Sequence, residues 1–173
     1  MLTGGHVVLR PFRPADHEAI WRAKLDPMTW ARTSAAPLVP IPLQTHLESA
    51  TSGLKPTDAM FAVDLDDVLV GQGLIFHVDD LARTAELGIS LLPEARGRGL
   101  CRDVVQVLLD YAFRSRNLRR VHLQTLAGNE AALRCYRAAG FVEEGRLREH
   151  AWVEGAYDDV VLMAVLQTDR PSR

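Results

Sequence analysis

The sequence predicts an α+β (mixed α/β) domain with a mixed sheet rather than a fully alternating parallel one. Three observations predict it. Expected strands come in runs, at residues 59–77 and 141–166, instead of alternating regularly with helices. One strand–helix–strand unit, residues 87–126, predicts a single parallel strand pair. The 173 residues are enough for one core, so a single domain over residues 1–173 is expected.

The N-terminal half begins with an expected strand over residues 6–12. A helix follows from Pro14 to about Leu25, because Pro-Ala-Asp-His-Glu is typical of a helix start. Residues 26–42 carry four prolines and no clear period, which predicts a loop long enough to suggest a binding role. Residues 43–50 predict a short second helix.

Three expected strands occupy the middle of the chain. Two apolar runs, residues 59–65 and 68–77, flank Asp66-Asp67 and predict a hairpin. Residues 83–92 are expected to add the third strand, antiparallel to the second.

The C-terminal half predicts two helices and three strands. Residues 98–116 carry apolar side chains at helical spacing, with one face buried. A strand is expected over residues 120–126 and a helix over residues 130–139. The final strands are expected at residues 141–152 and 157–166, joined by a turn.

Composition excludes several classes of protein. A net charge of −2 argues against generic nucleic-acid binding. No apolar run approaches the ~20 residues that span a membrane, and residues 1–6 lack the features of a secretory signal. Cys101 and Cys135 fit no metal or redox spacing, so a reduced protein of the cytoplasm without a metal site is expected.

An anion site is predicted where the expected strand at residues 87–92 meets the helix over residues 98–116. The glycines of the connecting turn allow a positive φ and a close approach of the backbone. The first N–H groups of the helix and its dipole favour a phosphate, and two arginines add attraction. The residues expected to bind a phosphorylated cofactor are Arg96, Gly97, Arg98, Gly99, Leu100 and Cys101.

Two common phosphate motifs fit this turn poorly. Gly97 and Gly99 supply the first two glycines of a dinucleotide fingerprint, but Arg102 stands where the third is needed. No acidic residue ends the next strand, near Gln124, where a ribose contact is expected. A P-loop is excluded because the chain contains no Gly-Lys-Ser/Thr sequence.

Four blocks of the chain have a characteristic sequence: Arg96-x-x-Gly99-x-Cys101, Asn129-x-x-Ala132 through Tyr136 to Ala139-Gly140-Phe141, Arg148 through Gly155-Ala-Tyr157-Asp-Asp159, and the opening Val8 to Asp16. Together they resemble the GCN5-related N-acetyltransferase (GNAT) superfamily, and in particular its RimJ/RimL-like branch. Cys101 departs from the usual Gly or Ala, and Ala132 from a frequent Ser. The resemblance implies the GNAT fold: a central mixed, mostly antiparallel sheet of about seven strands, about four helices on both faces, and a splayed parallel strand pair that binds CoA.

The resemblance implies an acetyl-CoA-dependent N-acetyltransferase in which a primary amine attacks the thioester directly, in a ternary complex. Such a reaction needs a base to deprotonate the amine, a donor for the oxyanion and an acid for the leaving thiolate. Glu86 is the candidate base, although a structural ion pair is an equal alternative. Tyr136 is the candidate acid, since a phenol keeps its proton at neutral pH; the alternative is a core aromatic residue.

Binding residues follow from the same resemblance. Asn129 is expected to contact the pantetheine arm as well as to cap a helix. Backbone groups of Ser90, Leu91 and Leu92 are expected to pair with pantetheine amides, as a strand edge does.

The acceptor side is predicted at Trp30, Tyr157 and Asp159, with a turn or strand-end role as an equal alternative for Asp159. Acidic residues in the expected hairpins, such as Asp64 and Asp79, could attract cationic amines. The acceptor stays open between a protein α-amine and a small amine such as an antibiotic, an amino acid or a polyamine. A monomer or a homodimer is expected, and a non-catalytic acyl-CoA-binding module is the alternative function.

Overall fold

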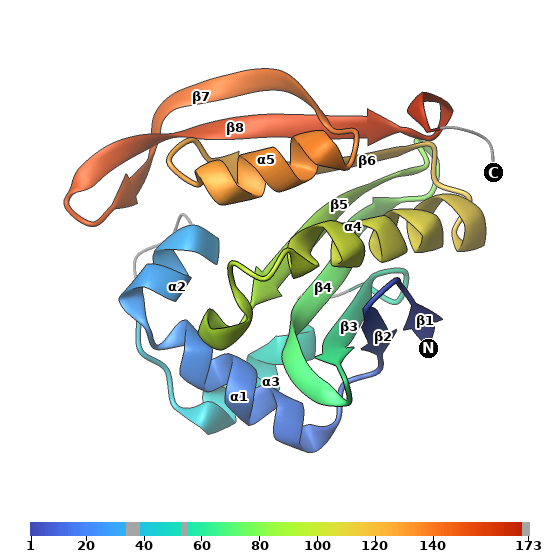
Figure 1. The fold of residues 1–173 in the computed structure, drawn as a ribbon. Helices are drawn as coiled ribbons and strands as arrows, with labels where there is room; N and C mark the ends of the chain where they lie inside the picture. The colour runs from blue at the N-terminus through green and yellow to red at the C-terminus, as the bar shows by residue number, and fades with distance from the viewer. Residues whose placement is uncertain (34–38, 53–54, 171–173) are drawn as a thin grey trace.

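The computed structural model describes residues 1–33, 39–52 and 55–170. In this part of the chain eight strands form one sheet in the order β1-β2-β3-β4-β5-β6-β8-β7 (Figure 1). The strands are β1 (Leu2–Thr3), β2 (Val7–Arg10), β3 (Ala59–Leu65), β4 (Val68–Asp79), β5 (Thr84–Leu91), β6 (Arg120–Leu126), β7 (Val142–Val153) and β8 (Ala156–Leu166).

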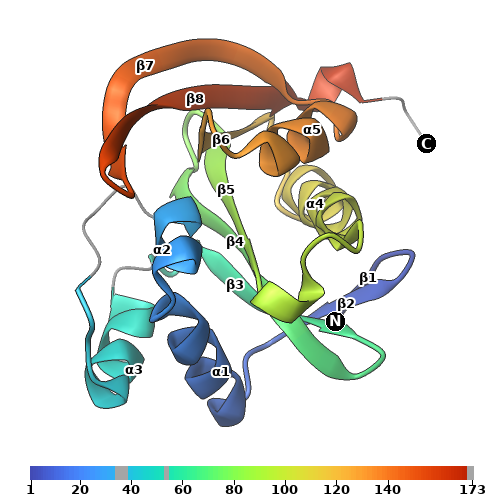
Figure 2. The same ribbon diagram turned by 60° about the vertical axis from the view of Figure 1, so that its left-hand side comes forward.

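Helices cover both faces of this sheet. Figure 2 shows α4 and α5 on one side of it, and α1, α2 and α3 on the other. The helices are α1 (Pro14–Lys24), α2 (Pro27–Thr33), α3 (Leu43–Ser52), α4 (Leu100–Asp110) and α5 (Glu130–Ala138); short helical turns lie at Pro93–Ala95, Tyr111–Ser115 and Gln167–Asp169.

The only parallel neighbours in the described sheet are β5 and β6. Their ladder pairs just Thr84, Ala85 and Glu86 with Arg120–His122, and the strands have no register pair beyond it. β6 continues instead as an antiparallel partner of β8 along its full length. Residues 87–91 of β5 therefore have a strand partner, β4, on one edge alone.

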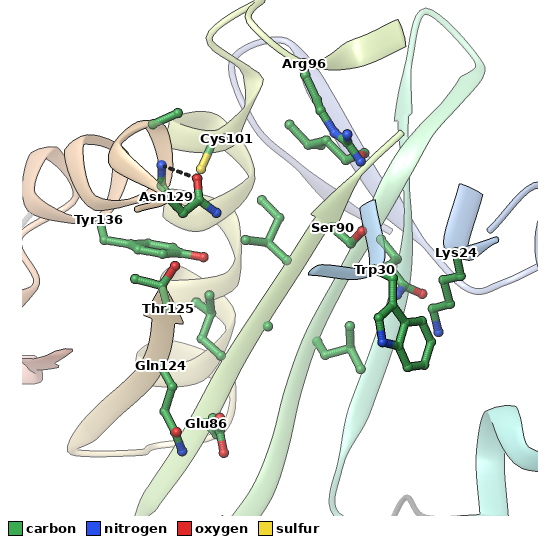
Figure 3. A pocket seen from close by; sticks show the side chains of 18 of the residues that line it. Lys24, Trp30, Glu86, Ser90, Arg96, Cys101, Gln124, Thr125, Asn129 and Tyr136 are labelled. Atoms are coloured by element: carbon green, nitrogen blue, oxygen red, sulfur yellow. Dashed lines mark hydrogen bonds between the residues drawn. The ribbon is translucent and has the colours of Figure 1, made fainter. Parts of the chain in front are cut away.

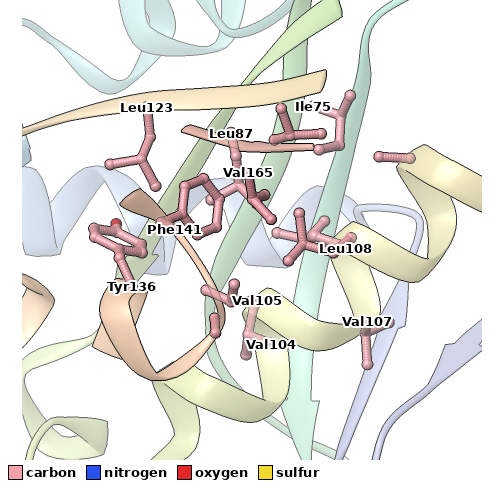
Figure 4. Packing of buried hydrophobic residues seen from close by; sticks show 14 of the residues in the cluster. Ile75, Leu87, Val104, Val105, Val107, Leu108, Leu123, Tyr136, Phe141 and Val165 are labelled. Atoms are coloured by element: carbon pink, nitrogen blue, oxygen red, sulfur yellow. The ribbon is translucent and has the colours of Figure 1, made fainter. Parts of the chain in front are cut away.

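The main core lies between α4 and the middle of the sheet (Figure 4). Val104, Val105 and Leu108 are fully buried, because the apolar residues of α4 recur at helical spacing on one face. Gly73 of β4 allows this helix to pack closely, since a Cβ there would lie 3.0 Å from the Leu108 Cδ1 atom.

The other face is fastened to the sheet by an ion cluster at the start of α1. Arg10 of β2 donates two hydrogen bonds to Asp64 of β3, at 2.6 and 2.9 Å, and two to Asp16 of α1, at 2.6 and 3.1 Å. All three side chains are buried. This cluster fixes where α1 begins relative to the sheet, and so where its far end, Lys24, lies.

The expected fold class is confirmed, with eight strands rather than about seven and five α-helices rather than about four in the described residues. The sequence did not indicate β1. This strand pairs with β2. The Asp103 carboxylate of α4 holds the connection between the two strands, because it accepts hydrogen bonds from the backbone N–H groups of Gly5, His6 and Val7.

Helix α2 replaces part of the loop expected over residues 26–42, so that prediction was wrong for residues 27–33. Asp26 accepts hydrogen bonds from the backbone N–H and the hydroxyl of Thr29, at 2.8 and 2.7 Å, and Pro27 takes the first helical position. The number of prolines favoured a loop, but an Asp-Pro pair also starts a helix. Residues 34–38 of the expected loop lie outside the described residues.

Candidate functional site

A cavity of about 550 Å³ opens where β5 and β6 diverge. We call its two sides the α5 half and the α1 half, with β5 running between them (Figure 3). Strand β5 contributes Glu86, Ser90 and Leu91 to the lining. The α5 half is lined by Gly97, Cys101, Gln124, Thr125, Asn129, Ala132 and Tyr136, and the α1 half by Lys24, Trp30, Gln72, Leu74 and Phe76.

The predicted anion turn has the expected backbone. Gly97 and Gly99 have φ values of +72° and +77°, and Gly99 is the N-cap of α4. A Cβ atom at either position would meet nothing within 4 Å, so the left-handed conformation, not lack of space, favours glycine here. The first N–H groups of α4 have no partner within the helix and are available to an anion at this end of the cavity.

The arginines of the turn have different environments. Arg96 lines the cavity, but its Nε donates to the Leu91 carbonyl at 3.1 Å and its Nη2 to the Thr29 hydroxyl at 2.8 Å. Arg96 therefore joins the end of β5 to α2. Arg98, Gly99 and Leu100 are not among the lining residues, and Leu100 is buried in the core.

The predicted edge of β5 is shorter than expected. Ser90 and Leu91 line the cavity and pair with β4 on their other side. Leu92 does not line it, and its N–H donates to the Val70 carbonyl at 2.9 Å. The Leu92 carbonyl accepts from the Ala95 N–H at 2.9 Å, so both backbone groups of Leu92 are engaged within the protein.

The start of α5 forms one wall of the cavity. The Asn129 side-chain oxygen accepts from the Ala132 N–H at 3.3 Å, so Asn129 caps α5 while it lines the cavity. Cys101 and Cys135 form a disulfide that joins α4 to α5. This corrects the expectation of two reduced, unrelated thiols: their spacing of 34 residues matches no motif, and only the packing of α4 on α5 brings them together.

Tyr136 lies in the α5 half with its hydroxyl directed toward the space between α5 and β5 (Figure 3). Its side chain is buried, and its ring centroid lies 5.7 Å from that of Phe141. Burial raises the pKa of the Tyr136 phenol above its ordinary value near 10, because the phenolate is poorly solvated there. At neutral pH this group is a proton donor.

Glu86 is the last residue of β5 that pairs with β6, and its side chain is 16% exposed. Its Oε2 atom lies 3.0 Å from Nδ1 of His77, a residue of β4. His122 faces Glu86 across the parallel ladder; burial lowers the pKa of His122, and the Glu86 carboxylate opposes that shift. Glu86 thus belongs to a small Glu–His cluster at one end of the cavity.

Two of the three predicted acceptor residues lie outside the cavity lining. Tyr157 is 65% exposed and packs on Trp152 in the β7–β8 hairpin, with ring centroids 4.8 Å apart. Asp159 of β8 accepts from the Glu149 N–H of β7 at 2.8 Å, where the pairing of the two strands is irregular, and lies 3.5 Å from Arg146. Trp30 does line the α1 half.

The hairpin carboxylates do not supply the cavity with negative charge. Asp64 is engaged with Arg10, and neither Asp64 nor Asp79 lines the cavity. Lys24, Gln72 and His77 lie at or beside the cavity but were not predicted, because each is brought there by packing between distant segments.

Two further observations concern the described residues alone. They contain no group of three or more His, Cys, Asp or Glu side chains placed to hold a metal ion. None of their helices is both long and apolar enough to cross a membrane.

Known proteins resemble this chain in sequence and in fold. The chain is 35% identical over 105 residues to a spermidine N(1)-acetyltransferase of Vibrio cholerae, covering 61% of each protein. It is 30% identical over 105 residues to a ribosomal-protein-serine acetyltransferase of Escherichia coli, covering 61% of this chain and 59% of that one. The match thus spans about three fifths of the length of these relatives.

A solved structure extends the likeness over nearly the whole chain. The spermidine N-acetyltransferase from Vibrio cholerae, in complex with CoA and spermine, superposes with a TM-score of 0.85 and 27% identity, covering 95% of this chain and 97% of that one. Residues 6–142 match the family model of the acetyltransferase (GNAT) domain. The splayed strands, the glycine turn at the start of α4 and this match agree: the chain belongs to the GNAT acetyltransferase family.

Proposed function

We propose that this protein is an acetyl-CoA-dependent N-acetyltransferase that transfers an acetyl group to a primary amine in a ternary complex. The observation that carries the proposal is the divergence of β5 from β6 directly beside the Gly97–Gly99 turn. One cavity thereby joins a phosphate-binding helix start to an unpaired strand edge, which suits the pyrophosphate and the amide-bearing arm of CoA.

The residues that would hold acetyl-CoA follow from this arrangement. The N–H groups at the start of α4 would bind the pyrophosphate. Backbone groups of Ser90 and Leu91 would pair with the pantetheine amides, and the Asn129 side chain faces the same path. The thioester would then lie between β5 and Tyr136.

The chemistry requires three proton transfers. Glu86, directly or through a water, would accept the proton of the acceptor ammonium, which frees the nitrogen lone pair to attack the thioester carbonyl. The C–N bond forms and the C–S bond breaks as Tyr136 gives its proton to the departing thiolate. The excess proton on the new amide nitrogen would then return to the Tyr136 oxygen, directly or through a water. Two observations support these roles: Tyr136 keeps its proton at neutral pH, and both side chains line the same cavity.

Release of the CoA thiol in the presence of an amine panel tests the proposal. We expect Tyr136→Phe and Glu86→Gln each to lower kcat about 10²-fold, the lower end of what general acid–base catalysis contributes. Tyr157→Phe and Asp159→Asn are matched controls, since they make the same changes outside the cavity lining. Full turnover by both cavity variants would remove the proposed roles.

A non-catalytic acyl-CoA-binding module is the alternative function. Calorimetric binding of CoA with no acetyl transfer to any peptide or small amine would favour it. Absence of CoA binding would overturn both proposals. The relatives act on polyamines and on a ribosomal protein by name, which supports an amine acceptor and a place near the RimJ/RimL-like branch.

We further propose a single catalytic domain over residues 1–173, as a monomer or homodimer in the bacterial cytoplasm. The relatives named above are bacterial, which supports the source. Light scattering measures the oligomeric state. In a reducing cytoplasm the Cys101–Cys135 disulfide would be transient rather than permanent.

A further inference from the structure

The α1 half of the cavity has a cation at its end. Lys24, the last residue of α1, lines it beside Trp30, on the far side of β5 from Tyr136 (Figure 3). The Lys24 side chain is partly buried, and within the described residues its ammonium group makes no hydrogen bond or ion pair to the protein. Desolvation lowers its pKa, which is the cost of holding this charge away from water.

The described surroundings of Lys24 supply a neutral imidazole rather than a carboxylate. His46 of α3 is buried, and its pKa is lowered first by burial and then by repulsion from Lys24 and His17, so the imidazole is uncharged at neutral pH. The carboxylate nearest to Lys24 along the chain is that of Asp26. Asp26 accepts two hydrogen bonds from Thr29 and lies outside the cavity lining.

Carboxylates are scarce in the sequence from residue 27 to residue 54, which contains one acidic residue, Glu48. The Glu48 side chain is exposed and accepts a hydrogen bond from Gln44. Among the described lining residues Glu86 is the one carboxylate, and it is hydrogen-bonded to His77. A polycation that reached from Glu86 toward Lys24 would therefore place a second ammonium beside a like charge.

We propose that the acceptor is an amine that also carries a carboxylate, which Lys24 binds, and an apolar portion, which lies on Trp30, Leu74 and Phe76. The proposal rests on the proposed function and names its substrate class: a short apolar peptide or an ω-amino acid, in which a chain separates the amine from the carboxylate, rather than a polyamine. The amine would face Glu86 and the carboxylate Lys24, so the two charges at the ends of the α1 half match those of the acceptor.

The test measures acetyl transfer and binding with paired acceptors. Leucine, the dipeptide Leu-Leu and ω-amino acids of increasing length are each compared with the matching carboxamide, and spermidine represents polyamines. The dipeptide distinguishes a peptide source from a free amino acid, and the ω-amino acids measure the distance between the two charges. We expect kcat/KM to favour the best carboxylate over its amide about tenfold or more, as a charged hydrogen bond does.

Variants of Lys24 test whether this residue causes the preference for a carboxylate over a carboxamide. We expect Lys24→Met to abolish the carboxylate-to-amide ratio mainly through KM, Lys24→Arg to retain it, and Lys24→Glu to favour spermidine. Lys55→Met is the matched control, because Lys55 is the second of the two lysines in the chain, is exposed and lies outside the cavity lining. Calorimetry with Leu-Leu and its carboxamide on the CoA-loaded protein measures the same preference without turnover.

The outcomes separate the two proposals. Absence of transfer to every acceptor, with binding of the carboxylates that depends on Lys24, would remove the enzymatic function and leave the carboxylate site. Transfer or binding that is equal for carboxylate and amide, or strongest with spermidine in the wild type, would overturn the carboxylate site. A preference that survives Lys24→Met would overturn it as well.

Discussion

Arg10 uses its guanidinium entirely inside the protein, between the carboxylates of Asp16 and Asp64. We expect Arg10→Met to lower the free energy of unfolding by about 3–5 kcal/mol, because two buried carboxylates lose their counter-charge. Urea denaturation measures this change. Arg22→Met is the control, since its ion pair with Glu18 is exposed and contributes about 0.3–0.5 kcal/mol.

Asp16 makes the free energy of unfolding depend on pH in the acidic range. Its hydrogen bond from Arg10 holds the pKa of Asp16 below the ordinary 3.8, so the folded state binds this proton less readily than the unfolded chain. The stabilisation is present above pH 3.8 and is lost as pH falls through the lower folded-state pKa. We expect the difference in unfolding free energy between wild type and Asp16→Asn to shrink below pH 3.8. A difference that stayed constant from pH 7 to pH 2 would contradict this origin.

At the residue scale, the sequence was informative where a residue belongs to a continuous motif. Tyr136, Asn129 and the Gly97–Gly99 turn were predicted because their spacing along the chain is itself characteristic. Lys24 and His77 reach the site through contacts between α1, β4 and β5, which no local spacing records.

The start of α4 depends on a left-handed residue. We expect Gly99→Ala to destabilise the fold by about 1–2 kcal/mol and to weaken CoA binding, because a Cβ disfavours a φ of +77°. Thermal unfolding and calorimetric titration with CoA measure the two effects. Gly145→Ala is a suitable control, because its added Cβ would meet the nearest atom of Leu162 at an ordinary 3.6 Å.

Helices α4 and α5 are joined by the Cys101–Cys135 disulfide. A loop of 34 residues closed in this way is stabilised by about 4 kcal/mol in the chain-entropy model. We expect the Cys101→Ser, Cys135→Ser double variant to lose a stabilisation of that order relative to oxidised wild type. Before the stability measurement, titration of free thiols without reductant tests whether the disulfide is present, and two free thiols would contradict it.

The elements were predicted where their apolar pattern is long, as in α4 and β8. Helix α4 and the helical turn Tyr111–Ser115 together cover most of the helix expected over residues 98–116, and β8 begins one residue before its expected start. Helix α2 was missed because it is short and its start depends on the Asp26 side chain rather than on a periodic face. β1 was missed because two residues carry no pattern, and Asp103 of a distant helix fixes the turn that follows it.

At the scale of the whole molecule, the order of strands and helices was enough to predict the class of fold. The place where the sheet divides was expected from the family resemblance, because the apolar residues on both sides of Glu86 in β5 do not mark it. The packing of α4 on β2, β4 and β5 is likewise a property of the assembled domain.

The short parallel ladder has a dynamic consequence. Strands β1–β5 and strands β6–β8 form two half-sheets, linked by the pairs at Thr84, Ala85 and Glu86 and by the α4–α5 disulfide. A ligand lying along residues 87–91 would act as a missing strand between them. We expect CoA to slow amide hydrogen–deuterium exchange on both half-sheets, far beyond its own contacts, so that the protein becomes one cooperative unit only when it is loaded. Protection confined to residues 87–101 would show that the half-sheets already move together.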